Sequence, residues 1–430
     1  MYGCQQNLIS DKEITPFLEF LCGEANNLVN CGIYLARQLL FKANYLVKKY
    51  DLEKELKSNI HYQFLCAQAA QQTLRGVAES FESYKQLREK QRQGELHFKP
   101  KPPNYRKSGG MATITYPKQA IRLKENKIRI PLGRRVKAAF GIDSFTIPMP
   151  SNLDFAQINE VRILPRNRCF YAEFVYEKRL EPVEVDKNNV LGIDPGINNW
   201  ITCVSNVGTS FIVDGKHLKS INKWYNKKVS AIKEKKPQGF WSNKLADLTE
   251  KRNRQMRDAI NKAARIVINH CIQKKIGVVV FGWNDGQRQN INLGKKTNQS
   301  FVQIPTAKLK ARIAQLCEQY GLDFVETEES YTSQSSFLDG DELPKYGEKP
   351  TGWKPAGKRT KRGLYRTAKN WYIHADCQGA ANIIKKVSRT LGFNLDRLSR
   401  GVLTRPHRIK LWSAKQTQSN AVLTRCVVSV

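Results

Sequence analysis

The residues best suited to chemistry are two aspartates, each at the edge of an apolar segment. Asp194 ends the apolar run of LGIDPGINN, between Gly192 and Gly196, and Asp376 begins the apolar segment of HADCQGAANIIKK. Small neighbours leave room beside a carboxylate for a metal ion and a phosphate. Asp before Pro-Gly is also common in turns, and Asp at a helix start caps free N–H groups. Taken singly, the two aspartates leave both interpretations open.

A third acid would be needed for metal-dependent cleavage of a phosphodiester. Such sites bring carboxylates from separate elements to two divalent ions about 3.5–4 Å apart. The apolar run VVVFGWN has Gly282 where a glutamate would be convenient, and Asp285 follows three residues later. The next predicted strand, FVETEES, supplies Glu326, Glu328 and Glu329. Alternation along a strand places the first two on one face and the third on the other. An exposed acidic strand end is the alternative interpretation.

The charge of the chain points to a polyanionic partner. Lys and Arg number 72 against 38 Asp and Glu, giving a formal net charge of +34. Such an excess repels itself in the folded state, and a bound polyanion would offset that cost. We therefore predict nucleic-acid binding, with a basic structural protein of the ribosomal type as the alternative. The apolar fraction of 40% is sufficient for real cores and excludes a disordered tail protein.

Three segments combine basic residues with features that suit a nucleic acid. In segment 345–371, basic residues alternate with aromatic residues, which can stack on unpaired bases. A flexible solvated loop is the alternative interpretation of this segment. Pro and Gly extend 98–110, and 294–300 has no apolar residue and lacks the strand–loop–helix setting of a P-loop. The predicted nucleic-acid contacts are Lys99, Lys101, Tyr105, Arg106, Lys107, Lys295, Lys296, Lys358, Arg359, Lys361, Arg362, Tyr365 and Arg366.

Cysteine and hydropathy patterns indicate the compartment. The ten cysteines are scattered without any C-x-x-C pair, and their apolar surroundings favour reduced, buried thiols. No stretch approaches the roughly 20 apolar residues of a membrane span, and the first residues lack a secretory pattern. We predict a cytoplasmic protein without a membrane partner.

The elements that must position the site fall into three regions. Apolar residues at three-and-four spacing predict helices from about 16 to 95, after a short strand in YGCQQNLI. Residues 98–183 contain short β-branched runs between Pro and Gly, which predict a small β-domain. Its hairpins are KENKIRI, with Glu125 and Asn126 near the turn, and 161–177.

From residue 185 the predicted order is strand, strand, strand, helix, strand, helix, strand, helix. This α/β order fits an RNase H-like sheet flanked by helices. The basic helical region 217–275 is expected to break near Pro237 and Gly239. Residues 332–371 are predicted to be irregular, and the last forty residues to be mobile because they lack periodicity.

Several of these motifs together resemble one family. GIDPGINN and HADCQGAANII resemble the first and third RuvC motifs of TnpB proteins, which bacterial insertion sequences encode and from which type V CRISPR nucleases descend. AQQTLRGVAESFESY, TITYPKQAIRLKENKIRIPLG and EESYTSQSSFLDGDELP extend the resemblance over about residues 15–405. By position, Asp194 and Asp376 match the first and third catalytic carboxylates.

The resemblance implies an RNA-guided DNA endonuclease that uses Mg²⁺ or Mn²⁺. Its partners would be a guide RNA and double-stranded target DNA, which it would cut beside a short flanking motif. It would act on the bacterial nucleoid as a monomer, although an oligomer stays open. An RNA-free nuclease or junction resolvase is disfavoured, because about 180 residues lie outside the nuclease region.

The chain departs from the family pattern at two places. Gly282 replaces the usual glutamate of the second motif, and some relatives carry this acid just before YTS. Glu329 matches that relocated position, so we predict it as the third ligand, with Glu328 as the alternative. If neither reaches the metal, the chain would be an inactive RNA-guided repressor or targeting factor. Relatives often carry a zinc ribbon, whose first cysteines would fall at Ser336 and Asp339, so we predict no structural zinc.

The predicted fold class is multidomain, with α/β, α and β parts. An RNase H-like (RuvC) nuclease domain is expected to accompany a helical recognition lobe and a small β-barrel (wedge) domain. The predicted boundaries are 1–14 for the first wedge strand, 15–97 for the helical lobe, 98–184 for the wedge barrel, 185–331 and 373–390 for the two parts of the nuclease domain, 332–372 for a basic target-strand-loading insertion without a zinc ribbon, and 391–430 for a mobile tail.

Overall fold

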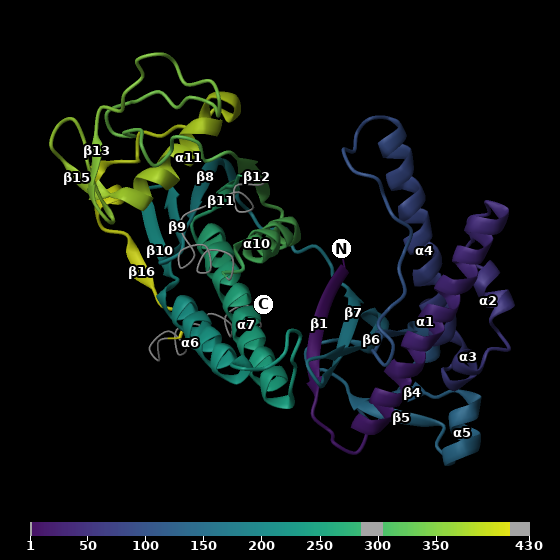
Figure 1. The fold of residues 1–430 in the computed structure, drawn as a ribbon. Coiled ribbons are helices and arrows are strands. Elements are labelled where there is room, and N and C mark those ends of the chain that lie inside the picture. The colour runs from purple at the N-terminus through teal and green to yellow at the C-terminus, as the bar shows by residue number, and fades with distance from the viewer. Residues whose placement is uncertain (1, 285–303, 413–430) are drawn as a thin grey trace. The chain divides into compact units, whose positions relative to one another are not determined.

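A computed structural model describes residues 2–284 and 304–412 of the chain (Figure 1). The chain divides into two compact units, Met1–Lys178 and Arg179–Val430. Each unit has buried apolar clusters of its own. No helix among the described residues combines the length and apolar character that a membrane crossing requires.

The first unit contains the predicted helices. Helix α1 (Thr15–Ala43) has Pro at its first turn and ends where Asn44 takes a left-handed conformation. Helix α4 (Ala67–Arg92) packs along α1, and a Cβ at Gly32 would lie only 3.1 Å from Leu74 Cδ2, so the glycine permits this close approach. Two short helices, α2 (Asp51–Glu55) and α3 (Ile60–Phe64), lie between them in sequence.

The strands of the first unit form two antiparallel sheets, in the orders β1-β7-β6-β2 and β3-β4-β5. Both predicted hairpins are present, and their turn residues Glu125–Asn126 and Asn167–Arg168 all have positive φ, as two-residue type I′ turns require. The pairing gives two sheets, and the barrel expected from the sequence stays a prediction. The bounds are β1 (Tyr2–Ile9), β2 (Ile114–Pro117), β3 (Arg122–Lys124), β4 (Lys127–Pro131), α5 (Arg134–Phe140), β5 (Ser144–Pro148), β6 (Ile158–Arg166) and β7 (Cys169–Glu177).

The second unit is built on a six-stranded sheet in the order β12-β11-β8-β9-β10-β16. β8, β9 and β10 pair antiparallel, whereas β11 pairs parallel with both β8 and β12. Every residue of β11 is buried, as predicted for the run IGVVVFG. The bounds are β8 (Asp186–Pro195), β9 (Asn199–Ser205), β10 (Thr209–Asp214), β11 (Ile276–Gly282), β12 (Asp323–Thr327) and β16 (His407–Ile409).

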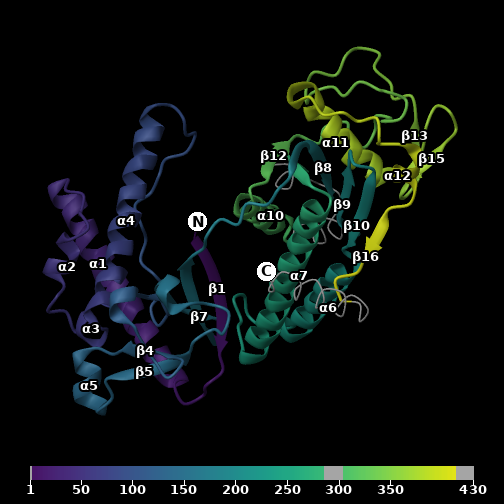
Figure 2. The ribbon, with the colours of Figure 1, turned by 180° about the vertical axis from the view of Figure 1, so that it is seen from behind.

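Helices cover both faces of this sheet (Figure 2). Alternate strand residues such as Leu191 and Val279 pack with α7 and α10, while Val190 and Val280 pack with α11. The basic helical region is broken between Lys233 and Asn243, as expected around Pro237. The bounds are α6 (Lys216–Lys233), α7 (Asn243–Gln273), α10 (Thr306–Tyr320), α11 (Ala375–Leu391) and α12 (Arg400–Thr404).

Two regions are more regular than the sequence predicted. The segment expected to be irregular contains most of a three-stranded sheet, β13 (Lys358–Lys361), β14 (Leu364–Arg366) and β15 (Tyr372–His374). The prediction of a mobile tail is wrong for its first part, since α12 and β16 are formed and β16 pairs with β10. These elements have three to five residues, too few to produce a periodic pattern.

Candidate active site

Asp194 stands at the carboxyl end of the central strand β8. It pairs across the sheet with Thr202 of β9 and is half-buried. Helix α11 passes so close that a Cβ at Gly379 would lie 2.8 Å from Asp194 Oδ2. A Cβ at Gly192 would likewise lie 2.5 Å from the carbonyl oxygen of Ala380. The two glycines therefore let α11 approach β8 and carry its first turn to Asp194.

Asp376 lies in that first turn of α11. The Nδ1 atom of His374 caps the helix by accepting a hydrogen bond from the backbone N–H of Asp376, at 3.3 Å. The carboxylate accepts a hydrogen bond from Asn199 Nδ2 at 2.6 Å and pairs with Arg359 at 3.4 Å. His374 therefore caps the start of α11 and helps to fix the backbone of Asp376.

The three glutamates after β11 point to different partners. Glu326 pairs with Lys310 at 2.6 Å. Glu328 pairs with Lys386; burial alone would raise the pKa of Glu328, but this contact and hydrogen bonds to Ser330 lower it. Glu329 lies beside Gly282, and its negative charge acts on Asp194. Of Glu328 and Glu329, it is Glu329 whose charge acts on Asp194.

The charges of two other acids act on Asp194. Burial raises the pKa of Asp194 well above its ordinary value, and the charges of Glu329 and Asp376 raise it further. The guanidinium of Arg359 acts in the opposite direction. A cavity of about 350 Å³ opens here, and its lining includes Asp194, Asp376, Asn199, Thr202, Arg359 and Arg362.

The donor set suits a hard divalent cation such as Mg²⁺ or Mn²⁺, which prefers carboxylate oxygens. The buried hydroxyl of Thr202, opposite Asp194, has no hydrogen-bond partner among the described residues. As placed, however, no three acidic, His or Cys side chains in 2–284 and 304–412 are grouped closely enough to hold an ion. Asn199 holds Oδ2 of Asp376 and Arg359 pairs with Oδ1, so a metal would have to displace Arg359 from this carboxylate. The residues fit the metal by chemistry, with a rearrangement of side chains.

The predicted contacts at 98–110 lie on an extended segment fastened to α1. Asn30 exchanges hydrogen bonds with the backbone of Arg106, whose guanidinium binds Asn26 Oδ1 at 2.9 Å. The guanidinium of Arg37 lies over the ring of Tyr105, with its Cζ atom 5.5 Å from the ring centroid. Tyr105 and Arg106 are exposed as well as tied to α1, and the other predicted contacts in the segment are also exposed. They are Lys99, Lys101 and Lys107.

The predicted contacts near the carboxylates are mostly exposed, with one error. Arg359 and Arg362 line the cavity, and Arg366 is half-buried. The prediction for Tyr365 is wrong as a surface contact, because its ring is fully buried and its hydroxyl donates to the carbonyl of Gln334 at 2.7 Å. Two further exposed contacts are Lys358 and Lys361, while Lys295 and Lys296 lie outside the described residues.

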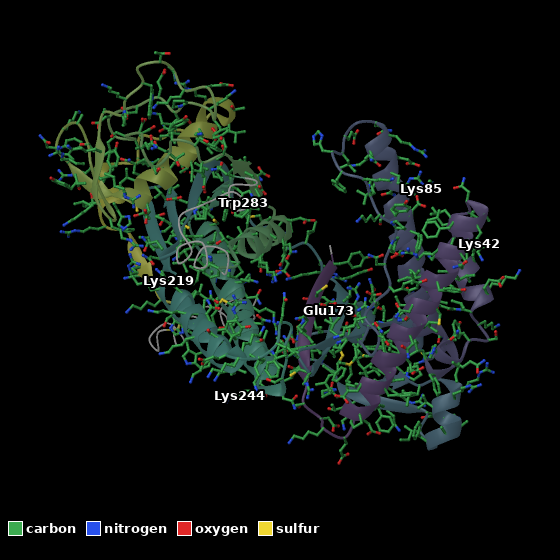
Figure 3. The ribbon with its side chains drawn as sticks, in the orientation of Figure 1. Lys42, Lys85, Glu173, Lys219, Lys244 and Trp283 are labelled. Carbon is green, nitrogen blue, oxygen red and sulfur yellow. The ribbon has the colours of Figure 1, made fainter. Side chains whose placement is uncertain are left out.

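The sequence did not assign the basic helices α6 and α7 to a contact. Figure 3 shows Lys219 on α6 and Lys244 on α7. The two helices bury Leu218, Met256 and Ala259 in the core, which leaves their basic side chains on the opposite faces. The exposed ones are Lys216, Lys223, Lys227, Lys228 and Lys233 on α6, and Lys244, Lys251, Arg254 and Lys262 on α7; Trp224 on α6 and Trp241 just before α7 are also exposed.

The positions where relatives place zinc-binding cysteines form a hydrogen-bonded node. Ser336 Oγ donates to Asp339 Oδ2 at 2.6 Å, and that oxygen also accepts from the backbone N–H of Ala368 at 2.8 Å. Asp341 Oδ2 accepts from the N–H groups of Ser336 and Ala356 at 2.7 and 2.9 Å. Two carboxylates thereby connect distant parts of the insertion.

Comparisons with known proteins agree with the motifs. Residues 173–284 match the family model OrfB_IS605, described as a probable transposase, which confirms the TnpB resemblance predicted from the sequence. This matched segment includes Asp194, β11 and both basic helices. No curated protein matches the chain.

Solved structures give distant likenesses. A Cas12f1–sgRNA–target DNA complex is 16% identical with a TM-score of 0.33, covering 89% of this chain and 98% of that one. The mini-RNA-guided endonuclease CRISPR-Cas_phi3 is 10% identical with a TM-score of 0.44, covering 90% and 92%. CasPhi-2 (Cas12j) bound to crRNA is 9% identical with a TM-score of 0.38, covering 93% and 99%. Likenesses this distant do not identify a function.

Proposed function

We propose that the chain is an RNA-guided DNA endonuclease whose RNase H-like (RuvC) domain cleaves DNA with the help of a divalent metal. The observation that carries the proposal is the cavity that Asp194 and Asp376 line together with Arg359 and Arg362, with Glu329 close enough for its charge to act on Asp194. The strand order, with three antiparallel strands followed by two parallel ones, supports the RNase H-like assignment. The guide RNA is inferred from the TnpB family match and the motifs.

The metal would be held by Asp194, Glu329 and Asp376. When bound, it would supply an activated water and stabilise the leaving oxygen of the phosphodiester. The chain's own residues orient the substrate, since Arg359 and Arg362 can neutralise and position a phosphate at the cavity. Arg359 would then exchange its contact with Asp376 for one with the substrate. Base pairing with the guide would select the target, while the protein reads a short flanking motif.

The second candidate is an inactive RNA-guided DNA-binding protein. It is favoured by the glycine at position 282 and by the absence, in the described ranges, of a preformed group of three ligands. Under this proposal Glu329 fills space beside Gly282 without binding a metal.

One experiment separates the two. The protein would be expressed with its flanking DNA so that native RNA copurifies, then incubated with a plasmid library that carries a guide-matched target beside randomised bases. Mg²⁺-dependent cutting next to one enriched motif, abolished by EDTA, Asp194→Ala and Glu329→Ala, supports the nuclease. Target binding without cutting under every metal tested supports the inactive protein. An absence of any defined RNA rejects both.

A further inference from the structure

We propose that Arg408, on the last strand β16, is a positioning residue for Asp376. This inference rests on the proposed function, because it treats Asp376 as a metal ligand. Among the described residues, Arg408 makes no hydrogen bond to Asp376. Its effect passes through Asn199, the side chain that donates to the Asp376 carboxylate.

The contacts form a continuous relay between four elements. Arg408 Nη1 donates to Asn199 Oδ1 at 2.9 Å, and Asn199 Nδ2 donates to Asp376 Oδ2 at 2.6 Å. Arg408 Nη1 also donates to Asp214 Oδ2 at 2.9 Å. The relay therefore begins on β16, is anchored on β10, crosses β9 and ends in the first turn of α11.

The chemistry of the amide explains why Arg408 matters. The side chain of Asn can present either its oxygen or its NH₂ group to a neighbour, since the two ends have similar shapes. A guanidinium can only donate, so Arg408 requires the oxygen of Asn199 to face it. The NH₂ group must then face Asp376. The carboxylate of Asp376 can only accept, so both neighbours favour the same orientation of the amide. Without Arg408, the oxygen of Asn199 loses its donor, and the amide is held less firmly against Asp376.

The anchor of the relay is well fixed. Asp214, at the end of β10, is buried, and its second oxygen accepts from the backbone N–H of Lys216 at 2.8 Å. The parallel pairing of Ile212 with Arg408 fixes the position of Arg408 along the strand direction of the sheet. Arg408 thus has one fixed contact for its charge and one for the amide that it orients.

A simpler interpretation is that Arg408 only ties an edge strand to the sheet through Asp214. That role predicts a loss of stability without a change in metal affinity at Asp376. The positioning role predicts that metal affinity falls while the melting temperature stays near that of a control. Arg405 provides the control, since it is exposed on the same segment and makes no side-chain hydrogen bond or ion pair in the described part of the chain.

The test compares Arg408→Ala, Arg408→Lys, Asn199→Ala, Asp376→Asn and Arg405→Ala in the full chain with its copurified RNA. Mn²⁺ binding is measured by electron paramagnetic resonance, and folding by thermal melting without metal. Arg408→Ala and Asn199→Ala should each weaken Mn²⁺ binding about 10–100-fold, as loss of a partner behind a ligand does. Arg408→Lys should restore part of that affinity, and Arg405→Ala should resemble the unchanged chain. The double variant of Arg408 and Asn199 should be no weaker than the worse single variant, because both belong to one relay.

The outcomes distinguish a failure of the positioning role of Arg408 from a failure of the proposed nuclease function. Equal Mn²⁺ affinity in the Arg408→Ala and Arg405→Ala variants overturns the positioning role, as does an Asp376→Asn variant that binds Mn²⁺ normally. If the Arg408→Ala variant does not fold, the Mn²⁺ affinities of Asn199→Ala and Arg408→Lys are compared with that of Arg405→Ala instead. Equal affinities then overturn the positioning role. Mn²⁺ binding that depends on Asp376 and Arg408, in a chain that cuts no DNA, supports the relay and rejects the nuclease.

Discussion

Gly282 and Glu329 occupy one space: a Cβ at Gly282 would lie 2.9 Å from both Cγ and Oε1 of Glu329. Real Cβ atoms do not approach other atoms so closely, so any side chain at position 282 would displace the glutamate. The glycine that departs from the family pattern therefore accommodates the acid that replaces it. We interpret the glycine at the end of β11 and the glutamate in the loop after β12 as one exchange, separate from the missing zinc ribbon.

The exchange predicts that Gly282→Ala lowers cleavage although alanine carries no charge. The new methyl would meet Glu329 and also Ile383 Cδ1, 2.5 Å away, so the glutamate must leave its position. We expect a loss on the order of 10–100-fold in the cleavage rate, as when a metal ligand is misplaced. Single-turnover cleavage at saturating Mg²⁺ would measure it. Gly277→Ala on the same strand, which crowds backbone far from Glu329, is the control.

The third carboxylate can be identified by a matched pair of variants. Glu329→Gln should reduce cleavage by about 1,000-fold or more, because a metal ligand supplies several kcal/mol to the transition state. Glu328→Gln should retain most activity, since Glu328 pairs with Lys386. The same plasmid assay compares both variants, with guide binding as the control for folding. Equal losses in both variants would contradict the assignment.

The exposed lysines of α6 and α7 should bind a nucleic-acid backbone without reading its sequence. Lys223→Ala and Lys227→Ala should weaken binding uniformly across sequences. Each lost phosphate contact should lower the slope of log affinity against log salt by about 1. Filter binding across a salt series would measure the slope, and Lys85→Ala, on α4 of the other unit, offers a matched comparison. A sequence-dependent loss would contradict a backbone contact.

The sequence could place Asp194 and Asp376, because each lies in a local motif at the boundary of an element. It could not choose between Glu328 and Glu329 by alternation, since β12 ends at Thr327 and the strand period no longer applies. The choice depends on the space at Gly282, which only the packing of β11 defines.

Other features depend on contacts that no local pattern contains. Arg408 reaches Asn199 across 209 positions of the chain, from a strand too short to predict. Tyr365 was assigned to the surface because basic residues surround it in sequence. In β14 the side chains alternate, so Tyr365 points inward while Leu364 and Arg366 are only half-buried.

The node of Ser336, Asp339 and Asp341 predicts that the insertion holds its structure without zinc. A zinc-selective chelator in Mg²⁺-free buffer should leave the melting temperature unchanged, and metal analysis of the purified protein should find no stoichiometric zinc. Asp339→Ala should instead increase amide exchange in 332–372, because the Ala368 N–H and the Ser336 hydroxyl lose their acceptor. Asp396→Ala is a suitable control, since Asp396 lies outside the node. A melting temperature that falls with the chelator would contradict a zinc-free insertion.

His270, at the end of α7, should make stability depend on pH. Burial lowers the pKa of His270 from 6.5 to about 4, and the charge of Lys274 adds to the effect. The neutral ring lies 2.9 Å from the Thr209 hydroxyl and against Phe211. Because the folded pKa lies below the unfolded one, this contribution is complete above pH 6.5 and is lost as the pH falls towards 4, by at most about 1.4 kcal/mol per pH unit. Thermal melting from pH 4.5 to 7.5 should show a shallower decline for His270→Gln than for the unchanged chain, and parallel declines would contradict the assignment.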